Sequence, residues 1–444
     1  MTNKEFTNTL YTNDNLFILT GMNSNYVDLI YLDPPFNSKR MYSAPVGSKA
    51  AGTSFKDMWT WNDVNEAYLE TLAEKYPALT MFIATIGEIH SDAMKAYLTY
   101  MAQRIVEMHR VLKDTGSLYL HCDPTASHYL KIVMDEIFGK KSFRNEIIWK
   151  RATPGSSKTV AKRLGSNHDI IFYYAKSQKT KFNLIFTEYP EKEIEKRFKR
   201  SDEKGRYKDA ELATYSQDTF ERLKIENRLI TTKSGKYRYK IYLDEIKGVL
   251  ADDIWTDLPP VNSQAKERTG YPTQKPLKLL HRIIKASSNE GDIILDPFCG
   301  CATTCVAAQQ LGRKWIGIDV EKQAVSILVE RLSDDAGLFK NFINTMIVPQ
   351  RTDIQIVEKS SSVKERLFKQ QNGICNGCRN EYLLKDFEID HIIPVSKGGG
   401  SYYENYQLLC GNCNKTKNNR PMEYLRIKVK AREKTLENKI IFGV

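Results

Sequence analysis

Strand-like and helix-like segments alternate along most of this chain. Val27–Leu32 and Asp169–Tyr174 are rich in aliphatic and aromatic residues, whereas Asp92–Lys113 repeats methionine and leucine at the spacing of one helix face. Another aliphatic run, Asp292–Asp296, leads directly into a loop and the start of a helix. Strands that alternate with helices are typical of an open, mostly parallel sheet covered by helices. The sequence therefore predicts an α/β fold.

Length and charge limit the possible functions. At 444 residues the chain is long enough for two or three compact units, and its formal charge of +12 suits a polyanionic partner. We find no apolar run of 18 residues and no apolar signal-peptide core at the N-terminus, so we expect no membrane partner and a cytoplasmic location. Residues 38–90 show no clear period and are expected to form a mobile loop region.

Asp33-Pro34-Pro35-Phe36 ends the first aliphatic strand. The prolines fix φ and stiffen the turn, so the Asp33 carboxylate and the Pro34 carbonyl are held in place. Both groups accept hydrogen bonds, and the exocyclic amine of a nucleobase offers two N–H donors. Phe36 adds a face on which an extruded base could stack. The motif predicts a site that aligns an amine with a methyl donor; the alternative is a strand-end turn with a purely structural role.

A second motif, DIILDPFCGCATT, occupies Asp292–Thr304 and joins a strand to a helix through a loop with Gly300. Such a loop lets an adenosine-type cofactor approach the backbone, and an acid at the end of the next strand, about 20 residues on, can bind the ribose hydroxyls. Asp319, in WIGIDV, lies 23 residues after Asp296. The pattern predicts a cofactor site, and a plain strand–helix junction is the alternative.

Together these motifs resemble the signature of DNA N6-adenine and N4-cytosine amino-methyltransferases. DPPF matches the family's catalytic motif, and DPFCGCATT resembles its cofactor motif, departing at Cys301 and at Ala302, where a second glycine is usual. The catalytic motif precedes the cofactor motif, as in the beta-ordered class. YPTQKP at Tyr271–Pro276 resembles the segment that closes over the methionine end of S-adenosylmethionine. NDNL at Asn13–Leu16 resembles the segment whose acid reaches the adenine ring.

This resemblance covers roughly residues 8–335 and implies a Rossmann-like class I methyltransferase domain over residues 1–346. The residues that it implies for catalysis are Asp33, Pro34, Pro35 and Phe36. The residues that it implies for binding S-adenosylmethionine are Asp14, Lys275, Asp296, Phe298, Gly300, Thr303 and Asp319. The charged segment 176–250 would be the target-recognition insert, and the expected partner is double-stranded DNA, bound by a monomer or homodimer.

The chemical identity of the substrate stays partly open. DPPF leans toward adenine N6, with cytosine N4 as the alternative. RNA or a protein glutamine would be a different substrate for the same chemistry, and a binding protein that has lost catalysis is a further class. A 5-methylcytosine enzyme would need a cysteine nucleophile, typically in a Pro-Cys pair, and the chain contains no Pro-Cys dipeptide.

Four cysteines near the end of the chain, Cys375, Cys378, Cys410 and Cys413, form two C-x-x-C pairs. In a chain expected in the cytoplasm, such pairs favour a metal over a disulfide. Four thiolates fit a tetrahedral Zn²⁺ site with no open position, so the metal would be structural.

The residues around these pairs resemble the HNH nucleases, whose ββα-metal fold arranges them around one divalent ion. By that resemblance His391 is the general base that activates water, and Asp390 and Asn414 bind Mg²⁺ or Mn²⁺. Asn405 would orient His391 or brace the loop. The alternative is a zinc-stabilised DNA-binding module without cleavage.

The expected organisation after the methyltransferase domain is a linker over 347–365, an HNH domain over 366–425 and a basic tail over 426–444. The leading hypothesis is therefore an adenine-specific DNA methyltransferase fused to an HNH endonuclease, as in restriction-modification.

Overall fold

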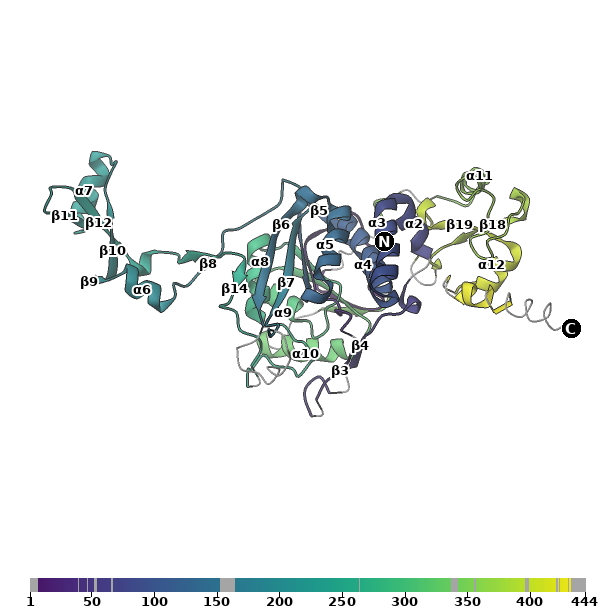
Figure 1. The fold of residues 1–444 in the computed structure, drawn as a ribbon, viewed down its shortest axis with the longest axis horizontal. Coiled ribbons are helices and arrows are strands. Elements are labelled where there is room, and N and C mark those ends of the chain that lie inside the picture. Colours follow the sequence, from purple (N-terminus) through teal and green to yellow (C-terminus); the bar gives the residue numbers. More distant parts are fainter. Residues whose placement is uncertain are drawn as a thin grey trace. The chain divides into compact units, whose positions relative to one another are not determined.

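The computed structural model describes residues 7–38, 40–45, 47–51, 54–64, 67–151, 164–262, 264–336, 342–354, 357–395, 399–420, 422, 424–429 and 431–432. The chain divides into two compact units, Asn183–Asp252 and the remainder (Figure 1). The predicted insert, 176–250, overlaps the smaller unit. Most of the predicted basic tail, residues 433–444, lies outside the described residues. No helix in the described part of the chain is long and apolar enough to cross a membrane.

A nine-stranded sheet forms the centre of the larger unit, with the strand order β14-β6-β7-β5-β2-β15-β16-β1-β17. Its strands are β1 Thr9–Thr12, β2 Val27–Leu32, β5 Leu112–Cys122, β6 Phe143–Lys150, β7 His168–Ala175, β14 Ile254–Trp255, β15 Ile293–Asp296, β16 Lys314–Asp319 and β17 Ile343–Thr345. The paired strands run parallel, except that β7 is antiparallel to both β5 and β6. The prediction of a mostly parallel α/β sheet is confirmed.

Helices cover both faces of this sheet (Figure 1). The helices are α1 Asn15–Gly21, α2 Ala67–Lys75, α3 Pro77–Ile89, α4 Asp92–Val111, α5 Pro124–Phe138, α8 Leu277–Ser287, α9 Thr303–Gln310 and α10 Gln323–Ala336. Successive β2 residues alternate between two cores, because strand side chains point to opposite faces. Ile30 and Leu32 pack in the core with α1, α4 and α5, whereas Leu29 and Tyr31 pack in the core with α8, α9 and α10.

Residues 38–90 are more regular than predicted. They contain the antiparallel pair β3 Arg40–Ser43 and β4 Ser54–Asp57, followed by α2 and α3. Helix α3 begins with Pro77 and buries Leu79, Ile83 and Ile86. Its outer face also carries apolar side chains, Met81 and Ile89, which are exposed. The expectation of a loop was wrong because an apolar outer face removes the contrast between faces on which a helical period is recognised.

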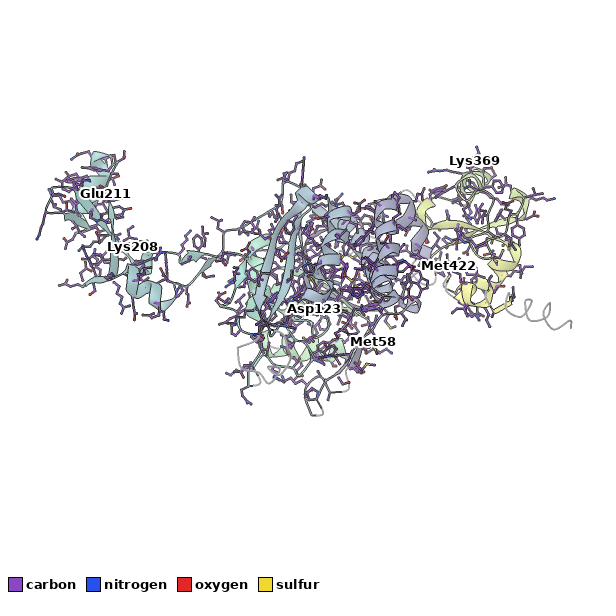
Figure 2. The ribbon with its side chains drawn as sticks, in the orientation of Figure 1. Met58, Asp123, Lys208, Glu211, Lys369 and Met422 are labelled. Atoms are coloured by element: carbon purple, nitrogen blue, oxygen red, sulfur yellow. The ribbon has the colours of Figure 1, made fainter. Side chains whose placement is uncertain are left out.

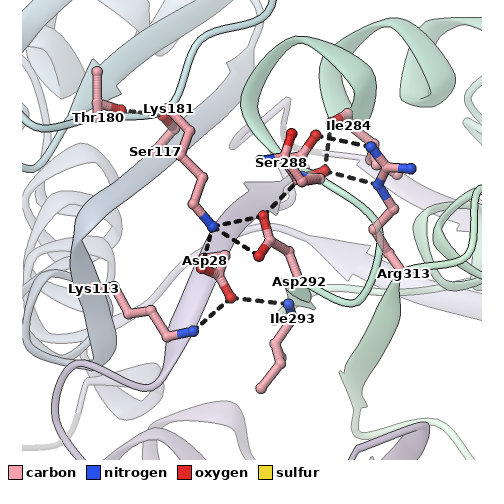
Figure 3. Close-up of polar contacts among 11 residues, drawn as sticks. Asp28, Lys113, Ser117, Thr180, Lys181, Ile284, Ser288, Asp292, Ile293 and Arg313 are labelled. Carbon is pink, nitrogen blue, oxygen red and sulfur yellow. Dashed lines mark hydrogen bonds and ion pairs between the residues drawn. The ribbon is translucent and has the colours of Figure 1, made fainter.

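An ion-pair network lies at the amino-terminal end of β2 and β15, away from the strand ends that carry the sequence motifs (Figure 3). Asp28 of β2 accepts hydrogen bonds from Lys113 at 2.7 Å, Lys181 at 3.1 Å and the Ile293 amide at 3.0 Å. Lys181 also pairs with Asp292 at 2.7 Å. The two cations hold the pKa of the largely buried Asp28 carboxyl below its usual value, against the opposing effect of burial. The network ties the chain just before the smaller unit to two central strands.

The smaller unit contains an antiparallel sheet of order β11-β12-β10-β9 and a short ribbon of β8 and β13. Its elements are β8 Phe186–Thr187, α6 Glu191–Arg197, β9 Arg200–Asp202, β10 Gly205–Glu211, α7 Gln217–Ile225, β11 Leu229–Thr231, β12 Tyr237–Tyr242 and β13 Val249–Leu250. Lys208 and Glu211, labelled in Figure 2, both lie on β10. Opposite charges pair across one sheet face, with Arg238 and Arg200 on Asp209 and with Lys240 on Asp202.

The C-terminal segment builds a separate small core around two antiparallel strands. Its elements are α11 Ser361–Gln370, β18 Phe387–His391, β19 Tyr406–Cys410 and α12 Gly411–Lys417. Two strands followed by one helix form the ββα arrangement that was expected here. Helix α11 begins inside the predicted linker, 347–365.

Candidate functional site

Four neighbouring parallel strands, β2, β15, β16 and β1, end at one edge of the large sheet. Asp33 follows β2, Asp296 ends β15, Asp319 ends β16 and Asp14 lies just after β1. Carboxyl ends of parallel strands are where open α/β sheets bind ligands. Sheet order therefore brings together residues that are far apart in the sequence.

A cavity of about 720 Å³ opens at this edge. The cavity is lined by all the residues that were predicted for methyl transfer and for binding S-adenosylmethionine: Asp14, Asp33, Pro34, Pro35, Phe36, Lys275, Asp296, Phe298, Gly300, Thr303 and Asp319. Met58, labelled in Figure 2, also lines the cavity. Its volume lies within the range of cofactor and substrate pockets.

The Asp33 carboxylate has one engaged oxygen and one free oxygen. Its Oδ2 accepts a hydrogen bond from Lys275 Nζ. Its Oδ1 is buried and has no hydrogen-bond partner among the described residues. A buried acceptor without a donor is costly, so this atom is suited to a donor that arrives with a ligand. The predicted role of Asp33 as an amine acceptor stays a prediction, and an unpaired buried oxygen is what that role requires.

Phe36 packs against a buried histidine that the sequence did not single out. The Phe36 and His121 rings are stacked, with centroids 6.1 Å apart and planes inclined by 20°. His121 Nδ1 lies 2.9 Å from the Tyr31 hydroxyl, and its Nε2 lies 3.2 Å from an Asp169 carboxylate oxygen. Burial, reinforced by nearby Lys275, lowers the pKa of His121 below its usual value, so the ring is neutral at pH 7. Because His121 is itself held by Tyr31 and Asp169, its stacking on Phe36 restrains the orientation of the Phe36 ring.

The glycine-containing loop has an unusual backbone. Gly300 has φ of +47°, and a Cβ there would lie 3.0 Å from the Tyr271 ring, so a side chain at this position would strain the backbone and press against the YPTQKP segment. Ala302 has φ of 58° and ψ of 30°, the left-handed region that favours glycine. The family's second glycine is therefore explained by the backbone, and alanine adopts the same conformation at some cost. Arg331 of α10 donates to the Cys301 carbonyl at 2.7 Å and holds the loop from behind.

Two carboxyl groups border this loop, that of the buried Asp296 and that of the partly buried Asp319. Burial raises the pKa of Asp296 to about 7, although it accepts hydrogen bonds from the Thr304 hydroxyl and the Phe298 amide. Burial also raises the pKa of Asp319 to about 6. Asp319 accepts from the Gly300 amide at 2.7 Å and from the Glu321 amide at 2.8 Å. Both acids therefore titrate close to neutral pH.

Asp14, which also lines the cavity, has both a backbone amide and a cation as partners. It caps α1 by accepting from the Leu16 amide at 2.8 Å and pairs with Arg104 at 2.9 Å. The Arg104 guanidinium also stacks on Tyr100, 3.2 Å from the ring centroid. Tyr100 in turn lies near Trp59 and Phe298, with centroid distances of 4.2 and 6.4 Å. These rings give the cavity an apolar wall suited to a flat heteroaromatic group.

The segment 38–90, which was expected to be a mobile loop, contributes to the cavity and to its support. Trp59 lines the cavity, and Asp57 accepts hydrogen bonds from the Asn37 amide at 2.6 Å and the Ser38 amide at 2.9 Å. Asp57 thus anchors the chain directly after Phe36. The aromatic-rich string DMWTWND was the available signal, but nothing local in it indicates which motif it contacts.

In the C-terminal core, the four cysteines meet as predicted. The sulfur atoms of Cys375, Cys378, Cys410 and Cys413 all lie within 4.8 Å of one another, and none forms a disulfide. Zn–S bonds of about 2.3 Å in a tetrahedron imply sulfur separations of about 3.8 Å. The cluster therefore fits one Zn²⁺ after small adjustments.

The residues predicted to bind the second metal are placed less simply. Asp390 pairs with Lys417 at 2.9 Å, and the buried Lys417 also donates to the His391 carbonyl at 2.8 Å. Asn414 donates to Glu388, an acid that the sequence did not single out although it lies two residues before Asp390 on β18. Side-chain oxygen atoms that could bind a hard divalent ion are present on β18 and α12. In this structure one of them, on Asp390, is paired with the Lys417 ammonium group.

The other two predicted nuclease residues are His391, at the end of β18, and Asn405, just before β19. His391 is half-buried, and its Nε2 lies 3.2 Å from the Ser401 hydroxyl. Asn405 is buried, accepts from the Ile393 amide at 2.9 Å and donates to the Ile393 and Gly400 carbonyls at 3.0 and 2.9 Å. Of the two roles expected for Asn405, these contacts correspond to bracing the loop.

Comparison with known proteins identifies similar sequences for both parts of the chain. Residues 27–330 match a family model described as DNA methylase, and residues 375–420 match the HNH endonuclease model. Type II methyltransferase M.EcaI from Enterobacter cloacae is 30% identical over 66% of this chain and 66% of its own length. The DNA adenine methyltransferase YhdJ from Escherichia coli is 26% identical over 73% of this chain and 82% of its own.

A third relative is the Mod subunit of the type III restriction-modification enzyme StyLTI from Salmonella typhimurium, 26% identical over 70% of this chain. The chain spans about half the length of that subunit and slightly under two thirds of M.EcaI. The DNA methylase model matches well over half of the chain, including most strands of the large sheet, most of the cavity lining and both strand-end motifs. The chain belongs to the DNA methylase family and carries an HNH domain at its C-terminal end.

Proposed function

We propose that this protein transfers a methyl group from S-adenosylmethionine to the exocyclic amine of a base extruded from double-stranded DNA. The observation that carries the proposal is the free, buried Asp33 Oδ1 on a stiff Pro-Pro turn, inside the same cavity as the Gly300 loop and Asp319. Phe36, held flat by His121, supplies the stacking surface for the base. Asp14, Asp319 and the aromatic wall supply groups for an adenosine moiety.

The chain's residues orient the amine rather than form a covalent intermediate. S-adenosylmethionine supplies an electrophilic methyl group on its sulfonium. Asp33 Oδ1 and the Pro34 carbonyl accept the two amine hydrogens, which directs the nitrogen lone pair away from them and toward the methyl group. The nitrogen would become positively charged as its bond to the methyl carbon forms and the bond from that carbon to the sulfonium sulfur breaks, with S-adenosylhomocysteine as the leaving group. The Asp33 carboxylate favours the charge on nitrogen until a proton is lost to solvent.

Adenine N6 is the target that we favour. The DPPF motif leans toward it, and YhdJ is named a DNA adenine methyltransferase. Cytosine N4 is the second candidate. The test is to incubate the protein with S-adenosylmethionine and unmethylated DNA and then to sequence the DNA at base resolution. We expect N6-methyladenine in one sequence motif; N4-methylcytosine would select the alternative, and an absence of methylation on DNA would overturn the proposal.

We further propose metal-dependent DNA cleavage by the HNH domain. The ββα arrangement, His391 at the strand end and the oxygen donors of Asp390, Glu388 and Asn414 support it. Zn²⁺ on the four cysteines would hold the fold, and Mg²⁺ or Mn²⁺ would serve the reaction. Cleavage of plasmid DNA with each metal tests this, and His391→Ala should abolish it. A wild-type protein that cuts with neither metal would favour a DNA-targeting module.

The smaller unit, Asn183–Asp252, is the target-recognition element in this proposal. A DNA substrate also agrees with the net charge of +12 and with a cytoplasmic location. Whether the protein acts as a monomer or a homodimer stays a prediction, to be tested by sedimentation.

A further inference from the structure

We infer that Lys275 is a positioning residue for methyl transfer: it holds the Asp33 carboxylate so that Oδ1 alone faces the target amine. The sequence resemblance placed Lys275 among the cofactor-binding residues, so this is a different role for it. The inference rests on the proposed function, because it concerns the same amine site.

Lys275 contacts the DPPF motif and also donates a long hydrogen bond of 3.5 Å to the Thr273 carbonyl. Its Nζ donates to Asp33 Oδ2, and it lies 5.5 Å from the centroid of the Phe36 ring. Lys275 is only 7% exposed, and the Asp33 side chain is 18% exposed. The pair joins residues 242 positions apart in the sequence, one after β2 and one just before α8. A cation this well buried is held by its anion, since neither charge is well solvated alone.

Hydrogen bonds also hold the backbone around Lys275 in place. The neighbouring Gln274 accepts from the Thr269 amide at 2.9 Å and donates to the Glu267 carbonyl at 2.6 Å. The Glu267 carboxylate in turn accepts from the Leu277 amide, in the first turn of α8, at 2.9 Å. These contacts fix the residues on either side of Lys275. Its ammonium group therefore reaches Asp33 from a rigid segment, which a positioning role requires.

The chemical consequence follows from the two carboxylate oxygens. If Oδ2 is occupied by Lys275, the carboxylate cannot rotate to exchange its oxygens, and Oδ1 keeps one direction toward the cavity. The pair is also neutral as a whole, so the empty site does not hold an uncompensated buried anion. Without the cation, the carboxylate would be free to rotate and would seek other donors. The amine would then bind in several orientations, of which few align its lone pair with the methyl group.

The experiment compares Lys275→Met, Lys275→Arg and a matched control, Lys278→Met, which removes the same charge from an exposed position three residues farther along. The readouts are kcat for methyl transfer from labelled S-adenosylmethionine to unmethylated genomic DNA, and the Kd of S-adenosylmethionine by calorimetry. We expect Lys275→Met to lower kcat about 100-fold at saturating cofactor, the effect of a small misalignment, with cofactor Kd unchanged. Lys275→Arg should recover part of kcat, and the control should equal wild type.

A double-mutant cycle tests whether Lys275 acts through Asp33. In an Asp33→Asn background, Lys275→Met should cause no further loss of residual kcat, because no carboxylate is left to orient. The cycle is also measured by thermal unfolding: Lys275→Met should lower Tm, and the added Asp33→Asn should restore part of it by removing the unpaired charge. This second readout keeps the test valid if Lys275→Met alone folds poorly.

The outcomes separate this inference from the proposed function. A higher Kd for S-adenosylmethionine, with a normal kcat at saturating cofactor, would mean that Lys275 binds the cofactor. If the losses in kcat multiply in the double-mutant cycle, Lys275 acts independently of Asp33. Either result overturns the inference and leaves the methyltransferase proposal intact. If the wild-type protein transfers no methyl group to DNA, the proposed function fails, and an orienting role toward a DNA amine fails with it.

Discussion

The cavity of the large sheet and the cysteine cluster of the C-terminal core are built in opposite ways. The cavity combines Asp14, Asp33, Lys275 and Asp319, which are brought together by strand order across most of the chain. The cysteine cluster comes from residues 375–413, with one C-x-x-C pair between α11 and β18 and the other at the junction of β19 and α12. A site assembled by a large sheet depends on the packing of the whole domain. A local cluster in a small core depends instead on what binds to it, because small cores bury little apolar surface.

The largest expected effect is therefore loss of zinc from the C-terminal core. Structural Zn²⁺ sites contribute roughly 10–16 kcal/mol of apparent binding energy to the folding of small domains. We expect a chelator to abolish hydrogen-exchange protection over residues 375–420 and leave the protection of the large sheet unchanged. Cys413→Ser should act in the same way. If the core keeps its protection after zinc is removed and shown to be absent by elemental analysis, the contrast between the two regions disappears.

The second prediction concerns Asp33, the proposed acceptor for the target amine. Asp33→Ala should lower methyl transfer by about 10³-fold or more, since the acceptor aimed at the developing charge is lost. S-adenosylmethionine affinity should stay close to wild type, because the Gly300 loop is built from another part of the sheet. His391→Ala is the matched control: it should remove cleavage and preserve methylation. Methyl transfer at the wild-type rate by Asp33→Ala would contradict the assignment of the active site.

The third prediction uses pH. The pKa of Asp319 is raised to about 6 and that of Asp296 to about 7. Cofactor hydroxyls donate to a carboxylate and not to its acid, so affinity for S-adenosylmethionine should fall about tenfold between pH 8 and pH 5 as these groups take up protons. Asp319→Asn should bind more weakly throughout and lose the step near pH 6. Calorimetry across this pH range provides the measurement.

Stability of the cofactor-free protein should change with pH in the opposite direction. Because folding raises both pKa values above that of a free aspartate, the two acids contribute stability that is fully present below about pH 4 and is lost as the pH rises through 6 and 7. Unfolding by denaturant at several pH values from about 4 to 8, in wild type and Asp319→Asn, checks this. Equal pH dependence in both proteins would exclude Asp319 as a contributor.

The smallest expected effect concerns Ala302. Its left-handed backbone costs about 1 kcal/mol for a residue with a Cβ, so Ala302→Gly should raise the free energy of unfolding by up to that amount. Ala307→Gly, in the interior of α9, is the matched control and should lower it by about 1 kcal/mol. The same substitution, Ala to Gly, should therefore change the free energy of unfolding in opposite directions at two positions five residues apart. A loss of stability at both positions would mean that the loop differs from the one described.

Much of the site followed from local pattern. The strand β2 and its Asp33 turn, the β15 loop and the two C-x-x-C pairs are contiguous signals, because hydrophobic runs, prolines and ligand spacing act over a few residues. The regular elements in residues 38–90 could not be predicted in this way. Helix α3 has apolar side chains on both faces, and Asp57 anchors the chain after Phe36 only because the fold places its carboxylate within hydrogen-bonding distance of the Asn37 and Ser38 amides.

The sequence by itself determined the two motif-bearing strand ends, the α/β class and the two C-x-x-C pairs that form the cysteine cluster, since each depends on short-range order along the chain. Only the tertiary structure decided which groups meet across long separations. It placed Lys275 on Asp33, His121 beneath Phe36 and Lys417 on Asp390. The physical reason is that such contacts depend on strand order and on the packing of distant segments, neither of which leaves a periodic signal in the residues that make the contact.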